Sequence, residues 1–315
     1  MTSIGGYLGF EFGKGTSPHA EAVALNLARH ALTYVALSRG YRRMFVPRFT
    51  CDVLREPLRR SGVEVSFYGI DAAMDPLFDS ATLDEGEVLL YTNYFGLKDA
   101  TVRSLASKGR PLLIDNAQSF YANPVKGADT YYSCRKFFGV PDGAYLYTDE
   151  RKEDPLDRDV SADRCEHLLR SADQGAEAGY AAFQANEAML DHIPLRAMSL
   201  LTERMMAAID HGAVSIRRRE NCLRLHAGLK DHNLLPIDPV APSVPMVYPF
   251  LTDDGTLRER LRRGKVYTAR YWPGLLAPVE AGTPEAHFAE KIVHLPIDQR
   301  YGPEHMDRIL ELVLA

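Results

Sequence analysis

The chain has 315 residues, of which 46% are hydrophobic and 25% are charged, and its formal net charge is −5. These proportions are typical of a folded globular protein, and the slight acidity gives no reason to expect nucleic-acid binding through bulk charge. No apolar run approaches the ~18 residues that a membrane span needs, so we expect no membrane association. The length favours about two domains.

Cysteines and histidines give no sign of a metal centre. The four cysteines, at positions 51, 134, 165 and 222, lie far apart, and the histidines are scattered without the spacing of a helical metal pair. The first residues lack the basic start and the sustained apolar stretch of a signal peptide. We therefore expect a protein of the reducing cytoplasm with no disulfide framework and no metal.

The first half of the chain repeats a short theme. Strand-like apolar segments occur at residues 44–46, 63–68, 88–91, 112–114 and 130–132, and helix-like stretches at 52–60 and 100–108. Strands that alternate with helices in this way are typical of βαβ units and a parallel sheet. Gly143 before residues 144–147 predicts a closing hairpin or antiparallel strand.

From about residue 156 the pattern becomes helical, and we predict helices over 178–190, 199–209, 217–229 and 304–314. Prolines at 236, 239, 242, 245 and 249 break regular structure and leave room for short strands at most. A run at 265–270 completes a smaller α+β unit. We therefore divide the chain into 1–212, which includes an N-terminal arm, and 213–315.

Polar residues gather where the strands of the first half end. Asn93 follows the third predicted strand, Asp115 the fourth, and Ser133 to Lys136 the fifth. Because the carboxyl ends of parallel strands meet at one edge of an open sheet, ligands bind there. Any strand can end in a polar turn, so it is the joint occurrence of an acid and an amine that indicates a site.

Three segments, 46–62, 111–120 and 130–148, resemble in order and spacing the DegT/DnrJ/EryC1/StrS family of sugar aminotransferases, within the fold type I pyridoxal-phosphate enzymes. Asp115, Gln118, Lys136 and the pair Asp142-Gly143 occupy the places of the family's motif residues. Residues 198–221, 248–250, 269–274 and 295–302 are also similar, so the resemblance covers nearly the whole chain.

The resemblance implies a three-layer α/β large domain over 1–212 with a mostly parallel sheet, a small C-terminal α+β domain, and pyridoxal 5'-phosphate as cofactor. It assigns Asp115 to the ring nitrogen, which must stay protonated if the cofactor is to withdraw electrons. It assigns Lys136 to the Schiff base with the cofactor and then to proton transfer. These two residues are the predicted catalytic pair.

Further cofactor contacts follow from the same resemblance. Gln118 is expected near the ring oxygen or the phosphate. Ser133 and Tyr131 stay alternatives for the phosphate, since fold type I enzymes often use the first position and the family uses the second. A helix N-terminus at Ala28 and Arg29 would add backbone N–H groups and a guanidinium.

Three departures from the family pattern stand out. Ala28 replaces a glycine at the phosphate site, and Cys51 replaces the aromatic residue that stacks on the ring, with Phe49 two residues earlier. No Asn stands in 194–199, where a partner-subunit Asn would help to hold the phosphate. Tyr7 in the N-terminal arm and Asn93 are predicted to approach the substrate.

The implied function is transfer of an amino group from glutamate to a keto sugar, nucleotide-linked, in polysaccharide or secondary-metabolite sugar biosynthesis. The implied active unit is a homodimer with its sites at the subunit interface. Two alternatives stay open. A cofactor-binding or regulatory relative with lost or altered activity is favoured by the departures, and a pyridoxal-phosphate sugar dehydratase is disfavoured by Lys136, because such relatives tend to carry His there.

Overall fold

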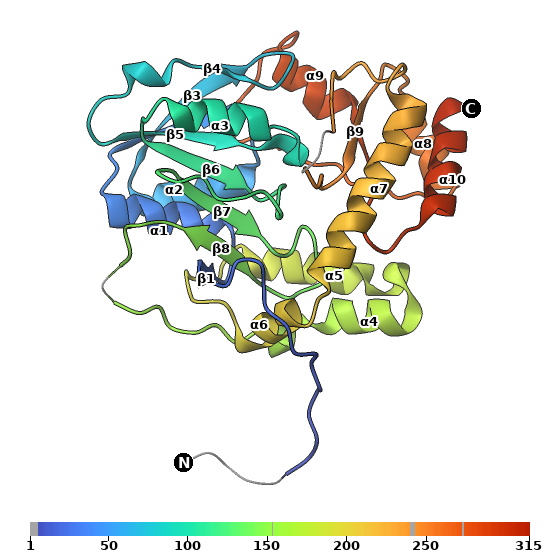
Figure 1. Cartoon of the computed structure of the whole chain (residues 1–315), viewed down its shortest axis with the longest axis horizontal. Coiled ribbons are helices and arrows are strands. Elements are labelled where there is room, and N and C mark those ends of the chain that lie inside the picture. Colours follow the sequence, from blue (N-terminus) through green and yellow to red (C-terminus); the bar gives the residue numbers. More distant parts are fainter. Residues whose placement is uncertain (1–5, 153, 240–242, 273) are drawn as a thin grey trace.

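The computed structural model describes residues 6–152, 154–239, 243–272 and 274–315 (Figure 1). Within these residues an eight-stranded sheet runs in the order β1-β8-β7-β6-β5-β2-β3-β4. The strands are β1 (Val23–Leu25), β2 (Arg43–Pro47), β3 (Glu64–Ile70), β4 (Pro76–Leu77), β5 (Glu87–Thr92), β6 (Leu112–Asn116), β7 (Asp129–Ser133) and β8 (Ala144–Tyr147). Strands β2, β3, β5, β6 and β7 pair in parallel, whereas β1, β4 and β8 pair antiparallel. The predicted, mostly parallel sheet is confirmed.

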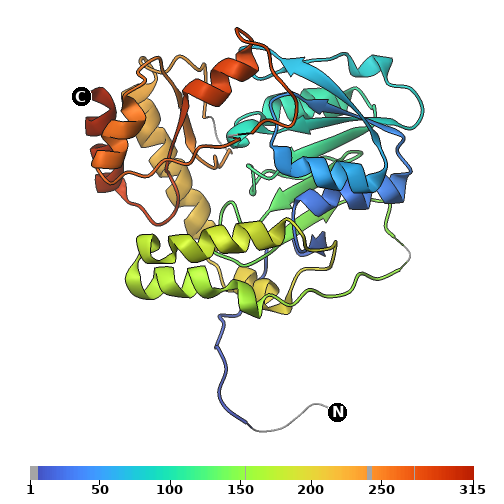
Figure 2. The same ribbon diagram turned by 180° about the vertical axis from the view of Figure 1, so that it is seen from behind.

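Helices cover both faces of this sheet. Helices α1 (Arg29–Arg39) and α2 (Arg55–Ser61) lie on one face and α3 (Asp99–Ser107) on the other, as the two opposite views show (Figures 1 and 2). Residues 52–54, which we expected to open α2, instead form a separate 3₁₀ turn. The three-layer α/β architecture is confirmed.

Side-chain alternation along the strands explains the two layers of core. On β5, Leu90 belongs to the apolar cluster under α1 and α2, whereas its neighbour Tyr91 belongs to the cluster under α3. On β7, Tyr131 and Tyr132 divide in the same way. A parallel sheet that helices cover on both faces needs strands with apolar side chains on both sides, and β5 and β7 have them.

A helical hairpin follows the sheet, and the sequence predicted only part of it. Helix α4 (Glu166–Gln174) escaped prediction, whereas α5 (Ala176–Leu190) and α6 (Leu200–Ala207) match the expected segments. Helices α4 and α5 lie side by side in both views (Figures 1 and 2). Figure 1 also shows the N-terminal arm leading away from the body of the molecule.

The C-terminal third builds an apolar cluster of its own. This third of the chain contains α7 (His211–Leu229), β9 (Tyr248–Leu251), α8 (Leu257–Arg263), α9 (Pro284–Lys291), β10 (Ile292–Leu295) and α10 (Pro303–Leu314). Strands β9 and β10 pair antiparallel, and α7, α8 and α10 pack with them around one cluster. Residues 265–270 form no strand, only a single bridge from Ala269 to His294. The boundary at residue 212 stays a prediction.

Helix α7 begins at His211, six residues before the predicted start at 217, because Asp210 caps it. The Asp210 carboxylate accepts the Ala213 N–H at 2.9 Å. This cap satisfies one of the free N–H groups at the helix start. In the residues that the structure describes, no helix is both long and apolar enough to cross a membrane.

A buried carboxylate fixes the turn between β7 and β8. Asp142 accepts hydrogen bonds from the N–H of Ser199 at 2.9 Å, from its hydroxyl at 2.8 Å, and from the hydroxyl of Thr202. These bonds join the turn to the start of α6, which Ser199 caps. Gly143 has a φ of 116°, and a Cβ there would lie 2.9 Å from Thr202 and 3.1 Å from Cys134. Both the backbone conformation and the close approach therefore require glycine.

Replacing Asp142 by alanine should destabilise the fold by about 3 kcal/mol, since the Ser199 N–H and the hydroxyls of Ser199 and Thr202 would lose their buried carboxylate acceptor. The measurement is urea unfolding followed by circular dichroism. Exposed Asp173 on α4 provides the matched control, and Asp173→Ala should change stability by less than about 0.5 kcal/mol. Equal effects of the two substitutions would contradict the assigned role.

Stability should also fall in mild acid, because three buried histidines are held neutral. Burial lowers the pKa of His19 and of His30 to about 4, and that of His294 to about 3. The unfolded chain takes up these protons near pH 6.5, well before the folded protein does, so the free energy of unfolding decreases as pH falls below that value.

The loss should be on the order of 2 kcal/mol per histidine between pH 7 and pH 5. Urea unfolding at several pH values measures it. Exposed His232→Gln should leave this dependence on pH unchanged. A flat profile across the same range would show that these three histidines are accessible to protons in the folded state.

Candidate functional site

A cavity of about 490 Å³, here called the Lys136 cavity, opens where β2, β6 and β7 end. This is the edge at which open parallel sheets bind ligands, and the volume suits a small molecule. Its wall contains all eight residues that the sequence assigned to the cofactor: Ala28, Arg29, Cys51, Asp115, Gln118, Tyr131, Ser133 and Lys136. The fold therefore brings together segments that are more than one hundred residues apart in the chain.

The acid and the amine that the sequence singled out face this one cavity. Lys136 lies just beyond β7 with an exposed side chain, and among the described residues no hydrogen bond or ion pair holds its amine. Asp115 is buried on β6 and accepts the Ala117 N–H at 2.8 Å. Burial raises the pKa of Asp115, while the positive charge of Lys136 opposes that rise. The two groups are thus close enough to influence each other.

Three buried polar atoms of wall residues have no partner of good hydrogen-bond geometry among the described residues, and one of them is Nε of Arg135. The other two belong to predicted cofactor residues: the hydroxyl of Tyr131, which lies beside Asp115, and the side-chain nitrogen Nε2 of Gln118. The other end of the Gln118 amide is fixed, because its oxygen accepts the Phe95 N–H at 2.7 Å. A buried donor without an acceptor costs about 1–3 kcal/mol, so both groups favour a polar ligand in the cavity.

Helix α1 begins at the cavity wall. Ala28 is its N-cap and provides no side-chain hydrogen bond. The N–H groups of His30 and Ala31 donate to the carbonyl oxygens of Leu27 and Ala28 at 3.1 and 3.0 Å, which leaves those of Ala28 and Arg29 without an acceptor among the described residues. The positive end of the helix dipole and these N–H groups favour an anion. Arg29, the first residue of α1, donates to the carboxylate of Asp191 at 2.6 Å. The predicted phosphate-binding guanidinium is therefore at the cavity, held by an acidic partner.

Helix α5 forms a wall that sequence reasoning missed. Phe183 and Glu187, one helical turn apart, both line the cavity. Glu187 accepts a hydrogen bond from Arg135, which directly precedes Lys136. The spacing of these two residues indicates a shared helix face, but no signal in the sequence places that face against β7. Arg270, Tyr271 and Trp272 complete the wall from the C-terminal part.

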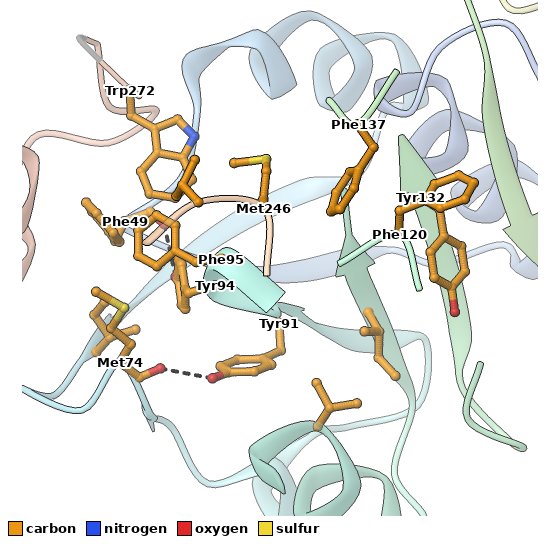
Figure 3. Close-up of a cluster of buried hydrophobic side chains, with 14 of the residues drawn as sticks. Phe49, Met74, Tyr91, Tyr94, Phe95, Phe120, Tyr132, Phe137, Met246 and Trp272 are labelled. Atoms are coloured by element: carbon orange, nitrogen blue, oxygen red, sulfur yellow. Dashed lines mark hydrogen bonds between the residues drawn. The ribbon is translucent and has the colours of Figure 1, made fainter. Parts of the chain in front are cut away.

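Cys51 lines the cavity, whereas Phe49 does not. Phe49 is buried in the apolar cluster, with its ring centroid 4.5 Å from that of Trp272 and 5.5 Å from that of Tyr94 (Figure 3). Burial raises the pKa of the Cys51 thiol, so it stays uncharged at neutral pH. A small neutral side chain thus occupies the position at which the family has an aromatic ring.

The two predicted substrate residues do not reach the cavity. The Asn93 amide is fully buried and donates to Asp99 at 2.7 Å and to Asn116 at 3.0 Å, and its oxygen accepts the Lys98 N–H at 2.9 Å. Asn116 follows Asp115 on β6, and neighbours on a strand point to opposite faces, so Asn93 lies on the α3 side. Tyr7 is 98% exposed on the N-terminal arm.

The sheet order, the three layers and the cavity at the strand ends define a fold type I architecture. Solved structures with this fold match the chain over most of its length. They include a DegT DnrJ EryC1 StrS aminotransferase from Brucella abortus, with 17% identity and a TM-score of 0.60 over 93% of this chain and 85% of that one.

Two further matches have similar scores. The sugar aminotransferase CalS13 from Micromonospora echinospora is 13% identical, with a TM-score of 0.59 over 94% of this chain and 87% of that one. NtdA from Bacillus subtilis, with bound cofactor PMP, is 15% identical, with a TM-score of 0.61 over 96% and 78%. No family model and no curated protein matches the sequence. The resemblance is therefore confirmed at the level of the fold.

Proposed function

We propose that this protein is a pyridoxal-phosphate aminotransferase that acts on a keto sugar. The observation that carries the proposal is the meeting of Lys136 and Asp115 in one cavity, with Arg29 and the start of α1 in the same wall. When bound, the cofactor supplies an electron sink for the carbon that exchanges its amino group.

The wall residues fit such a cofactor. Asp115 is a buried carboxylate, and a nearby cation stabilises its charged form. A protonated ring nitrogen would provide such a cation. The Tyr131 hydroxyl, which lies beside Asp115, and the Gln118 amide nitrogen offer hydrogen bonds to polar substituents of the ring or to the phosphate. Ser133, buried in the same wall, remains the alternative to Tyr131 for the phosphate.

Each residue has a distinct task in this proposal. The amine of Lys136, free of protein partners in the described chain, binds the cofactor and carries a proton at its Nζ atom. Asp115 holds a proton on the ring nitrogen. Arg29 and the first N–H groups of α1 hold the phosphate. Cys51 borders the cavity without adding charge.

The substrates belong to the same proposal. CalS13, which shares the fold, is a sugar aminotransferase, and this supports a keto sugar as acceptor. We extend the resemblance to glutamate as amino donor, to a nucleotide-linked acceptor in polysaccharide or secondary-metabolite sugar biosynthesis, and to a homodimer in the cytoplasm.

The test is to incubate the protein with pyridoxal 5'-phosphate, record the visible absorbance and reduce with borohydride. We expect the label on Lys136 in a peptide map and none on Lys126, an exposed lysine outside the cavity. Consumption of glutamate without loss of water from the sugar would then separate amino transfer from dehydration. Absence of binding at millimolar cofactor would contradict the proposal and favour a regulatory relative.

Arg29 should contribute to phosphate binding. Arg29→Ala is expected to weaken pyridoxal-phosphate binding by about 10- to 100-fold, because charge-assisted hydrogen bonds contribute about 1.5–3 kcal/mol. Asp191→Asn should strengthen pyridoxal-phosphate binding by about two- to fivefold, because it releases Arg29 from its ion pair. The gain is small because the Asp191 side chain is 55% exposed, and exposed ion pairs are weak. Titration by fluorescence measures both.

Pyridoxal, which lacks the phosphate, is the internal control. Its affinity should be unchanged by both substitutions, and Arg170→Ala in an exposed pair on α4 should change neither affinity. If pyridoxal and pyridoxal phosphate lose affinity equally in Arg29→Ala, then Arg29 does not bind the phosphate.

A further inference from the structure

Two side chains from the C-terminal third hold the residue that follows Lys136. The carbonyl oxygen of Phe137 accepts a hydrogen bond from the side-chain nitrogen of Gln299 at 2.9 Å and another from the guanidinium of Arg218 at 3.3 Å. The same guanidinium carbon lies 4.4 Å from the centre of the Phe137 ring. Arg218 and Gln299 are themselves joined, because Arg218 Nε donates to the Gln299 oxygen at 2.8 Å.

Arg218 is an unusual residue for this place. It is only 2% exposed, and among the described residues no carboxylate lies within ion-pair distance of it. Its remaining hydrogen bond goes to the carbonyl oxygen of Met246 at 3.0 Å. A buried charge is expensive unless its donors are satisfied, so these three acceptors fix the guanidinium in one orientation.

The loop that carries Lys136 is also held by the Arg135–Glu187 ion pair and by the buried rings of Phe137 and Phe138. It leaves β7 through a tight turn in which the N–H groups of Phe137 and Phe138 both donate to the Cys134 carbonyl, at 3.0 and 2.9 Å. The Phe137 ring points into the apolar cluster near Phe120 (Figure 3). The Lys136 side chain has no anchor of its own in the described structure. Its direction therefore depends on how the turn is held, and the Phe137 carbonyl is one of the points at which the turn is held.

We propose that Arg218 and Gln299 are positioning residues for Lys136: by holding the Phe137 carbonyl they fix the backbone from which the Lys136 amine enters its cavity. They also connect α7, whose later residues form the C-terminal cluster, to the reactive loop. The consequence for amino transfer rests on the function proposed above. The positioning itself is a property of the protein without cofactor.

The experiment compares Arg218→Met, Gln299→Leu and Arg218→Lys with the control Arg224→Met. Arg224 lies on the same helix but pairs with Asp307 in an exposed site. Cofactor-free protein is used for hydrogen exchange of residues 134–140 and for acetylation of Lys136 across pH, with other lysines as internal references.

We expect exchange of residues 134–140 to rise about tenfold in Arg218→Met and Gln299→Leu, as loss of a hydrogen bond near 1.4 kcal/mol predicts. The pH profile of Lys136 acetylation should shift in both, while α10 keeps its protection. Arg218→Lys should keep part of the protection of residues 134–140 against exchange. Arg224→Met should leave exchange and acetylation unchanged. In the loaded enzyme, kcat should fall with little change in KM for the amino donor.

Two results would overturn the proposal. One is unchanged exchange and acetylation in both variants. The other is an equal rise of exchange in α10 and in residues 134–140. Arg218 would then stabilise the packing of the C-terminal part in general and would not specifically hold the Lys136 loop. If Arg218→Met does not fold, Gln299→Leu decides the matter, since Gln299 is only part-buried. Because these readouts need no cofactor, failure of the proposed function is seen separately, as absence of borohydride labelling.

Discussion

Lys136→Ala should abolish amino transfer, lowering the rate by a factor on the order of 10³ or more, and should leave the protein folded. Loss of a positioned acid–base group alone costs about 10²–10⁴-fold. Here the same amine also has to bind the cofactor. The measurement is a coupled assay of glutamate turnover with the purified variant.

The fold should survive because the Lys136 amine is exposed and holds no partner in the described structure. The unfolding midpoint in urea should change little, and cofactor should still bind through Arg29 and Asp115, without a borohydride-stable label. Lys126→Ala, at an exposed position away from the cavity, is the matched control and should keep full activity. A Lys136→Ala protein that retained a tenth of the activity would show that another group moves the proton.

Local patterns were sufficient to predict the centre of this site. Each parallel strand can be recognised in the sequence as a short apolar run. The residues that follow β6 and β7 must then lie at the same edge of the sheet. Asp115 and Lys136 therefore come together as a consequence of strand order, and Cys51 joins them from the end of β2. Strand direction accounts for their shared position at one edge, whereas their roles follow from the family resemblance and stay predictions.

Asn93 shows where such reasoning stops. It too follows a parallel strand, but its side chain points to the α3 face, where it bonds with Asn116 and Asp99. Which face a residue takes at a strand end depends on the backbone after the strand. Here the chain enters a tight turn in which Phe95 has a positive φ of 57°. No periodicity in the sequence specifies that turn.

Contacts between distant segments were the other part that the sequence could not supply. Glu187 forms an ion pair with Arg135 because α5 lies against the cavity. The ion pair between Asp191 and Arg29 has the same origin. Arg218 stands in the basic run 217–219, a pattern typical of a solvent-facing helix surface, yet it is buried against the Phe137 carbonyl. Charge and helical spacing do not reveal such pairings, because they arise from the packing of whole elements.

Asp115→Asn should reduce amino transfer by about 10²-fold or more, while the cavity keeps its shape. An amide has the size of the carboxylate, but it carries no charge to keep a ring nitrogen protonated, and loss of such a preorganised electrostatic contact typically costs 10²–10³-fold. The expected signature is a larger effect on kcat than on cofactor affinity, measured by steady-state kinetics and by titration.

The dependence on pH gives this prediction a second readout. Because burial raises the pKa of Asp115, its carboxyl takes up a proton at a higher pH than an exposed aspartate does, and the attraction for a protonated ring is then lost. Cofactor affinity of the parent should therefore weaken as pH falls through that raised value, and Asp115→Asn should lack this step. An acid step of equal size in both proteins would place the titrating group elsewhere and remove Asp115 from the role assigned to it.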